Sequence, residues 1–300
     1  TCASNFVKRL RVDETIAEPR YVFHFMARPQ FRHALSPFIR GTTIQNLSIS
    51  AAFGATRIPL PPLAEQRRIA SILDHADALR ARRRHTLNLL DTLTQSIFID
   101  MFGDPFTNPM AHSVVRLPEL GSIDRGVSKH RPRNAPELLG GSWPLIQTGD
   151  VSRSSGYVDK WTSTYSDLGL VQSRLWPAGT LCITIAANIA RTAEISFAAC
   201  FPDSIVGFSC EDASITRFVR VWFTFMQSRL ESAAPESAQK NINLATLRSL
   251  SLPLPGNAER QRFLQATEHL RMLGQGLRDS QEELEGLCAA VKQRAFSGNL

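Results

Sequence analysis

The sequence predicts an α+β fold in which globular α/β domains are joined to two long antiparallel coiled-coil helices. Three observations predict this class. Residues 63–102 contain neither Gly nor Pro, so one uninterrupted helix fits them. Apolar residues in that stretch recur at alternating spacings of three and four, as in a coiled-coil seam. A similar stretch returns at residues 251–300, and an internal repeat of this kind supplies each helix with a partner.

Residues 1–56 hold short apolar segments broken by polar residues and Pro, which indicates the C-terminal part of a first globular domain. The chain starts at Thr1 in mid-pattern, so we expect that domain to be truncated at its N-terminus. Ile58 to Leu60 predicts a short strand, stopped by Pro61 and Pro62 because proline cannot donate a ladder hydrogen bond.

Residues 57–105 form the first helical segment. Its helix is expected to begin near Leu63 or Ala64 and to stop at Gly103 and Pro105. At about 1.5 Å per residue it is roughly 57 Å long, so it needs a partner along its length. The predicted helix–helix seam consists of Ile69, Ile72, Ala76, Leu79, Leu90, Leu93 and Ile97.

The second helical segment, residues 251–300, aligns with the first without a gap after a shift of 194 residues. The same shift places its seam at Phe263, Ala266, Leu270, Leu273, Leu284, Leu287 and Val291. Two central seam positions of the first helix, Arg83 and Thr86, are polar, and the latter corresponds to Ser280. Antiparallel seams bring these positions together, so we predict a polar contact there that sets the register.

Residues 106–250 read as a second, complete globular domain of α/β type. After a linker, a strand edge is expected at Val114 to Leu117, and a basic loop at Ser122 to Asn134. Strands are expected from Trp143 and within the apolar run 181–190, and a core helix at Phe218 to Ser228.

The composition favours a nucleic-acid partner and argues against metal and membrane. The net charge is +7, carried mostly by Arg, which suits bidentate contacts to phosphate and guanine. The five cysteines are odd in number and lack a CxxC pair, which indicates structural thiols in a reduced, cytoplasmic protein. The histidines have no metal-ligand spacing, so neither a metal nor another cofactor is predicted. The longest apolar run is too short to cross a bilayer.

The sequence lacks the motifs of the enzyme classes that act on DNA in such a size range. A nuclease of the PD-(D/E)xK type needs a Lys two residues after its second carboxylate, but Glu211 is followed there by Ala213. An amino-methyltransferase needs an Asn-Pro-Pro-aromatic motif, which Asn108-Pro109-Met110 does not provide. No phosphate-binding P-loop is present. We therefore predict a protein that binds and scaffolds and has no catalytic residues.

Several motifs, in order along the chain, resemble the DNA-specificity (S) subunit of type I restriction–modification systems. IPLPPLAEQRRIASILDHADALR and LLDTLTQSIFIDMFGDP resemble the central conserved region of that family. WPLIQTGDV, WPAGTLCITIAANIARTAEISFAACFPDSIVGF and SAQKNIN resemble its target-recognition domain. The resemblance covers the chain from about Gly41 to Leu300.

The resemblance implies a fold, a function and partners. Such subunits carry two target-recognition domains, each reading half of a bipartite site in double-stranded DNA. Their two conserved helices act as a spacer and dock two methylation (M) subunits, and restriction/translocase (R) subunits complete the complex. The chain departs from the pattern in its shortened first domain and in Gly274, Gly276 and Gly286, which predict a weaker or bent second helix or mere divergence.

Polar residues in loops of the second domain are the candidates for DNA contact, suited to phosphates or base edges. They are Lys129, Arg131, Arg133, Gln147, Thr148, Asn188, Arg191, Gln239, Lys240 and Asn241. Two alternatives stay open at this point. The chain can associate with a second copy and read a symmetric site, or it can be a standalone metal-dependent nuclease, which the missing motif disfavours.

Overall fold

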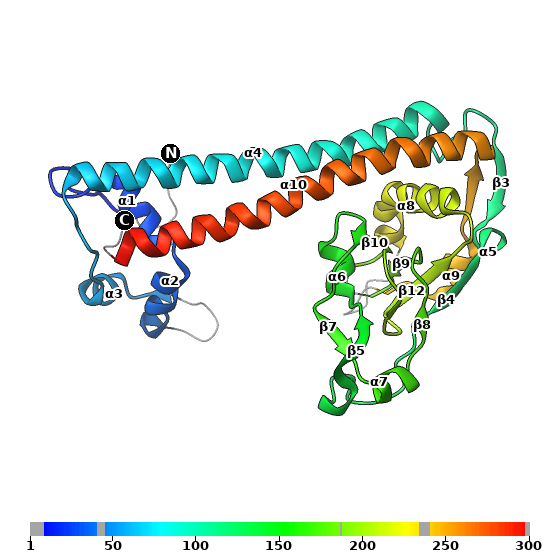
Figure 1. Ribbon diagram of the computed structural model, residues 1–300, viewed down its shortest axis with the longest axis horizontal. Helices are drawn as coiled ribbons and strands as arrows, with labels where there is room; N and C mark the ends of the chain where they lie inside the picture. Colours follow the sequence, from blue (N-terminus) through cyan, green and yellow to red (C-terminus); the bar gives the residue numbers. More distant parts are fainter. Residues whose placement is uncertain (1–8, 41–45, 187, 234–240, 298–300) are drawn as a thin grey trace. The chain divides into compact units, whose positions relative to one another are not determined.

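The computed structural model describes residues 9–40, 46–186, 188–233 and 241–297. These residues form two compact units, the first made of residues 1–88 and 274–300 and the second of residues 89–273. Two long helices, α4 (Leu63–Phe102) and α10 (Asn257–Ser297), each contribute one end to each unit, and within each unit they run antiparallel, as predicted (Figure 1). The domain boundaries at residues 56, 105 and 250 remain predictions.

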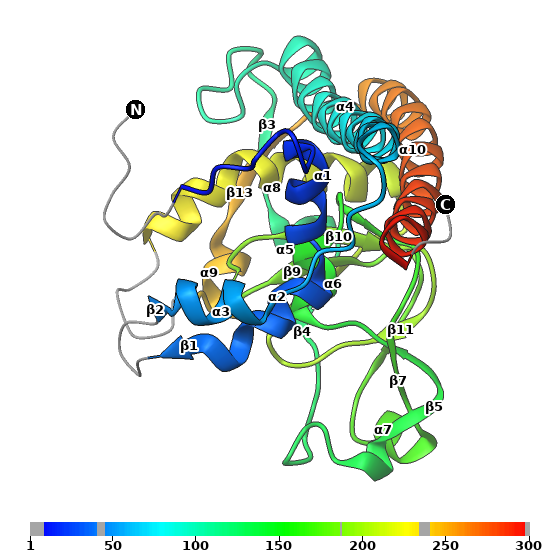
Figure 2. The ribbon, with the colours of Figure 1, turned by 90° about the vertical axis from the view of Figure 1, so that its left-hand side faces the viewer.

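The first unit packs short helices against the ends of α4 and α10. In the view along these long helices, α1 lies against both (Figure 2). Its short elements are α1 (Pro19–Met26), α2 (Pro29–Leu35), a 3₁₀ helix (Ser36–Phe38), the antiparallel pair β1 (Ile39–Arg40) and β2 (Asn46–Leu47), and α3 (Ile49–Ala55). The buried core consists of Tyr21, Phe25, Phe31, Ile69, Ala70, Leu73, Ala295 and Phe296.

The strand predicted at Ile58 to Leu60 is absent, which corrects that prediction. Its repeat counterpart is β13 (Ser251–Leu254), which pairs with β3 (Ser113–Arg116). Within the described residues of the first unit no strand takes the place of β3. The Pro59 carbonyl instead accepts a hydrogen bond of 2.8 Å from Tyr21 Oη, so its polar group is satisfied without a sheet.

The second unit is built on a five-stranded sheet, β4-β12-β9-β10-β6, and a four-stranded sheet, β7-β5-β11-β8. Both faces of the larger sheet are covered: Leu181 and Ile183 face one core with α8, and Cys182 faces a second core with Trp176. This double burial explains the unbroken apolar run in the sequence. Gly207 in β12 is needed here, because a Cβ would lie 2.6 Å from the Trp176 ring.

The remaining elements of this unit follow in chain order. They are α5 (Leu117–Leu120), β4 (Ser122–Arg125), a 3₁₀ helix (Pro136–Leu138), β5 (Leu139–Leu145), α6 (Thr148–Arg153), β6 (Tyr157–Val158), β7 (Ser163–Tyr165), α7 (Asp167–Val171), β8 (Leu175–Trp176), β9 (Leu181–Thr184), β10 (Thr192–Ile195), β11 (Ala199–Cys200), β12 (Ile205–Ser209), α8 (Ala213–Ala233) and α9 (Leu244–Ser249). The start of the predicted basic loop is thus an edge strand, β4, which pairs with β12.

The seam between α4 and α10 is shifted at every second position from the predicted one. The buried or half-buried positions that recur at alternating spacings of four and three in α4 are Ile69, Leu73, Ala76, Arg80, Arg83, Leu87, Leu90, Thr94, Ile97 and Met101. Those of α10 are Phe263, Thr267, Leu270, Gly274, Leu277, Gln281, Leu284, Cys288, Val291 and Ala295, the same positions after the repeat shift. The helix α10 continues through its three glycines without a break.

Five predicted seam residues are therefore exposed: Ile72, Leu79, Leu93, Leu273 and Leu287. A seam that includes Ile69 and Ala76 can place each alternate position three or four residues later. The two choices are both apolar at Ile72 and Leu73, but the later choice is polar at Arg80. The structure uses the later choice, so the predicted residues form a second apolar row beside the seam.

Candidate nucleic-acid interface

One end of the five-stranded sheet gathers polar side chains from segments that are far apart in the sequence. Strand β12 is antiparallel to both β9 and β4, so it begins where they end: Ile205 pairs with Thr184 and Val206 with Arg125. The loop 126–134, the residues before β12 and the described residues that follow β9 consequently meet at this end. Sequence order alone does not reveal this, because the pairing of strands decides which loops are neighbours.

The basic loop 126–134 is fixed by hydrogen bonds at this sheet end. The backbone N–H groups of Lys129 and His130 donate to Gln172 Oε1 at 2.7 and 3.1 Å. Arg131 Nη1 donates to two loop carbonyls at 2.6 and 2.8 Å. The guanidinium groups of Arg131 and Arg133 both pair with Asp203, and Lys129, Arg131 and Arg133 are all exposed. The loop therefore presents its cations from a defined conformation.

The turn after β9 holds the next candidates. Asn188 and Arg191 are exposed, and the Arg191 N–H donates to Thr184 Oγ1 at 3.1 Å. Asn241, also exposed, forms an isolated antiparallel bridge with Ala186, so it belongs to the same sheet end. The predicted residues Gln239 and Lys240 lie outside the described residues.

Gln147 and Thr148 are positioned by a different element. They begin α6, where the Gln147 N–H donates to Asp150 Oδ2 at 2.8 Å. The helix α6 contacts β6, β9 and β10. Gln147 is exposed and Thr148 is half-buried.

Two arginines at or near this sheet end, Arg174 and Arg248, were missed by sequence reasoning, and a third, Arg125, lies in the predicted basic loop but was not among the candidates for DNA contact. Arg174 and Arg248 both pair with Asp124, at 3.2 and 2.7 Å, and Arg125 Nε donates to the Asp203 carbonyl at 2.9 Å. Arg125 lies in the loop already predicted to be basic, but Arg174 precedes a strand and Arg248 lies in α9. Because Arg174 and Arg248 are far from the basic loop in the sequence, no local pattern predicts that they join it. The position of Arg174 directly before a predicted strand was the available indication.

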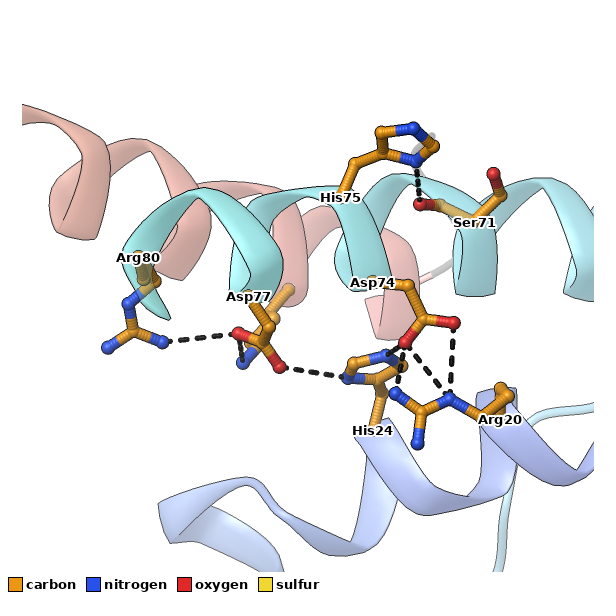
Figure 3. Close-up of polar contacts among 8 residues, drawn as sticks. Arg20, His24, Ser71, Asp74, His75, Asp77 and Arg80 are labelled. Atoms are coloured by element: carbon orange, nitrogen blue, oxygen red, sulfur yellow. Dashed lines mark hydrogen bonds and ion pairs between the residues drawn. The ribbon is translucent and has the colours of Figure 1, made fainter. Parts of the chain in front are cut away.

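A guanidinium–carboxylate clamp attaches each unit's globular part to a long helix, and it is repeated. In the first unit Arg20 Nε donates to both Asp74 oxygens at 3.0 and 3.1 Å, and buried His24 contacts Asp74 at 2.9 Å (Figure 3). In the second unit buried Arg217 pairs with Glu268 at 2.9 Å. Asp74 and Glu268 are counterparts in the repeat, and sequence reasoning missed both contacts.

The clamps change the acidity of their carboxyl groups. The hydrogen bond from Arg20 lowers the pKa of Asp74. Burial raises the pKa of Glu268, but hydrogen bonds from Arg271 and Arg217 outweigh it and the pKa is lowered overall. Among the described residues, no group of three or more His, Cys, Asp or Glu side chains has metal-binding geometry, and no helix is long and apolar enough to cross a membrane.

Comparisons with known proteins identify relatives of the whole chain. A family model described as "Type I restriction modification DNA specificity domain" matches residues 1–89 and 112–267. The Escherichia coli type I restriction enzyme EcoBI specificity subunit is 23% identical over 330 residues, covering 98% of this chain and 68% of that protein. The EcoKI specificity subunit of E. coli K12 is 20% identical over 306 residues, covering 93% and 65%.

A solved structure has a similar fold. The crystal structure of a type I restriction-modification system S subunit from M. genitalium aligns with a TM-score of 0.58 at 13% identity, covering 95% of this chain and 74% of that one. The chain spans about two thirds of the length of the two curated relatives.

Proposed function

We propose that the second unit of this chain, which belongs to the type I restriction–modification DNA specificity family, reads a DNA sequence for a modification and restriction complex. One observation carries the proposal: basic and amide side chains from separated segments converge at one end of the five-stranded sheet. Fixed loops with exposed Arg, Lys and Asn side chains suit contacts to phosphates and base edges. Two DNA-reading surfaces of this kind on one chain would read a bipartite site.

The repeat supports a two-headed arrangement. Each unit holds one end of α4 and one end of α10, and each fixes its globular part to a long helix through the same clamp position. In this proposal the paired helices act as the spacer between two half-sites of double-stranded DNA. A packed helical pair holds its length better than a flexible linker does.

The second apolar row supplies docking surfaces for two methylation subunits. Leu79 is 51% exposed in the first unit, and its counterpart Leu273 is 55% exposed in the second. A helix that is apolar on more than its seam is suited to a further helical partner. Because the repeat presents the row twice, two copies of the same partner fit, and restriction/translocase subunits would then join the methylation subunits.

In this proposal the chain works in the cytoplasm and contributes recognition and assembly, while chemistry belongs to its partners. It needs no cofactor of its own. This agrees with the family's role in DNA specificity and with the lack of a catalytic motif in the sequence.

Co-expression with the methylation subunits of the same system tests the proposal. The purified complex is expected to methylate plasmid DNA at a single bipartite motif, which sequencing of modified bases identifies. Two different half-sites would indicate two distinct heads, whereas an inverted repeat would favour the alternative in which two copies of the chain associate. Recovery of the chain without any methyltransferase, or methylation with no motif, would contradict the proposal.

A further inference from the structure

We propose that the second unit carries a phosphate-binding surface for the DNA backbone, organised by Asp124 and Asp203, and that its arginines fix the position of the duplex and do not read bases. The surface consists of Arg125, Lys129, Arg131, Arg133, Arg174 and Arg248 with these two carboxylates. The inference rests on the proposed function and goes beyond it by separating positioning residues from base-reading residues.

Asp124 organises the first half of the surface. Its two oxygens pair with Arg174 and Arg248, at 3.2 and 2.7 Å. Arg174 also lies over the ring of Trp176, 3.9 Å from its centre, and Arg248 donates to the Ile123 carbonyl at 2.9 Å. Both guanidinium groups are thus held in place, yet their side chains are 44% and 48% exposed. Arginines held in one conformation lose less entropy when they bind.

Asp203 organises the second half in the same way. It pairs with Arg131 and Arg133, and its own carbonyl accepts from Arg125 Nε. The loop that carries Arg131 is bonded to Gln172 and Ser173 on its other side, directly before Arg174. The two halves are therefore connected through one short loop and form one surface.

The charges of this surface do not balance. Six basic side chains and two carboxylates leave a surplus of four positive charges. Each carboxylate is shared by two exposed guanidinium groups, so it neutralises one of them. The surplus charge is what a row of phosphates would neutralise, with release of counterions from the DNA.

The hydrogen bonds already made disfavour base reading. Arginine reads guanine through two parallel N–H groups directed at O6 and N7. In Arg248 the Nε and Nη2 groups are occupied by the Ile123 carbonyl and Asp124, and in Arg131 both Nη groups already donate. These side chains still present charge and single N–H groups, which suffice for a phosphate oxygen.

The salt dependence of binding tests this assignment. The chain is purified in complex with its methylation subunits, and its affinity for a duplex of about 40 base pairs of mixed sequence is measured against KCl concentration. Arg174→Gln combined with Arg248→Gln is expected to reduce the slope of log affinity against log salt by about 2, since each phosphate contact contributes about 0.9. The same fold loss is expected on the duplex carrying the methylated motif, so the specificity ratio stays unchanged.

Two further variants distinguish a loss of phosphate contacts from a misfolded protein. Asp124→Asn removes a negative charge but keeps one accepting oxygen, and Arg174 and Arg248 keep their contacts with Trp176 and the Ile123 carbonyl. The variant is therefore expected to raise affinity for the mixed-sequence duplex and to steepen the slope, which a misfolded protein cannot do. Arg116→Gln is the control: Arg116 is an exposed arginine of the same unit that pairs with its neighbour Glu119 at 2.9 Å, and neither affinity nor slope should change.

An unchanged slope in the double variant, with normal binding by the wild-type complex, would overturn the inference and leave the proposed function intact. So would a loss confined to one base-pair position of the motif, since that is the signature of base reading. A wild-type complex that binds no duplex would overturn the proposed function and this inference with it.

Discussion

Arg83 Nη1 donates to Ser280 Oγ at 2.6 Å, in the layer where the repeat predicts a polar contact between the long helices. Arg80 lies one turn earlier and its Nη2 is 3.8 Å from Glu285. This layer was predictable because a polar residue at a seam position of one helix faces a seam position of the antiparallel helix. The repeat shift makes Leu277 the counterpart of Arg83 and Ser280 that of Thr86, so it predicted the polar layer but not Ser280 as the partner of Arg83.

Arg83→Met is expected to leave the free energy of unfolding unchanged or to raise it by up to about 1 kcal/mol. A half-buried charge loses hydration that one hydrogen bond recovers only in part, and Met fills a similar volume. Urea unfolding followed by circular dichroism measures the change. A loss of more than about 1 kcal/mol would mean that the polar contact contributes stability as well as register.

Asp74 is expected to make the first unit more stable above pH 4 than below it. The hydrogen bond from Arg20 lowers the pKa of Asp74 in the folded state, so the ionised carboxylate favours folding above its unfolded value of about 3.9. That contribution is lost as the pH falls through the folded pKa. The wild type should therefore be more stable than Asp74→Asn at pH 6, and the difference should narrow in acid.

Thermal unfolding of both proteins from pH 3 to pH 6 measures this difference. Asp100→Asn is the control, because Asp100 is exposed on the same helix. A difference between wild type and Asp74→Asn that stays constant over this pH range would contradict the assignment.

At the scale of elements, the two clamps join α1 to α4 and α8 to α10 at equivalent positions but in different surroundings. The Arg20 side chain is 51% exposed, whereas that of Arg217 is 4% exposed and also contacts Thr267 and Glu194. Tyr157 lies beneath Arg217, with the guanidinium 4.9 Å from its ring centre. The two clamps should therefore contribute very different amounts to the free energy of unfolding.

Arg217→Met is expected to reduce the free energy of unfolding of the second unit by about 3–5 kcal/mol, because it leaves Glu194 without its buried partner, whereas Glu268 keeps its ion pair with Arg271. Arg20→Met, the matched substitution, should cost at most about 1 kcal/mol, as for an exposed pair. All four tryptophans lie in the second unit, so their fluorescence reports its unfolding, and circular dichroism reports both. Equal losses in the two variants would contradict this account.

The elements themselves differ in how far the sequence predicts them. The extent of α4 follows from its lack of Gly and Pro, and its antiparallel partner from the repeat. The seam did not follow in full, because Ile72 and Leu73, or Leu79 and Arg80, are neighbours on the helix and hydrophobicity favours the wrong member of the second pair. Burial against α10 selects Arg80, whose guanidinium reaches Asp77 and Glu285.

At the scale of the whole molecule, the candidate interface was predicted in part. The loop with Lys129, Arg131 and Arg133 was visible as a run of cations without a nearby acid. Arg174 and Arg248 join it only because the order β4-β12-β9 brings distant loops to one sheet end. Their shared partner Asp124 is one strand residue among many, and strand pairing between residues 81 to 87 positions apart leaves no local pattern in the sequence.

The two exposed apolar rows yield a prediction about assembly. If Leu79 and its counterpart Leu273 each form the centre of one docking surface, Leu79→Lys should remove one methylation subunit from the complex and the double variant with Leu273→Lys should remove both. A lysine in an apolar contact must lose its hydration without gaining a partner, which costs several kcal/mol. Native mass spectrometry of the co-expressed complex counts the subunits directly.

Leu168→Lys is the matched control. Leu168 is 64% exposed and belongs to α7, which is part of neither long helix. This variant should leave two methylation subunits bound. Loss of both partners from either single variant would mean that the two rows do not act separately, and that one surface, extending along both helices, holds the partners together. Retention of both partners by the double variant would place docking on a surface other than the two rows.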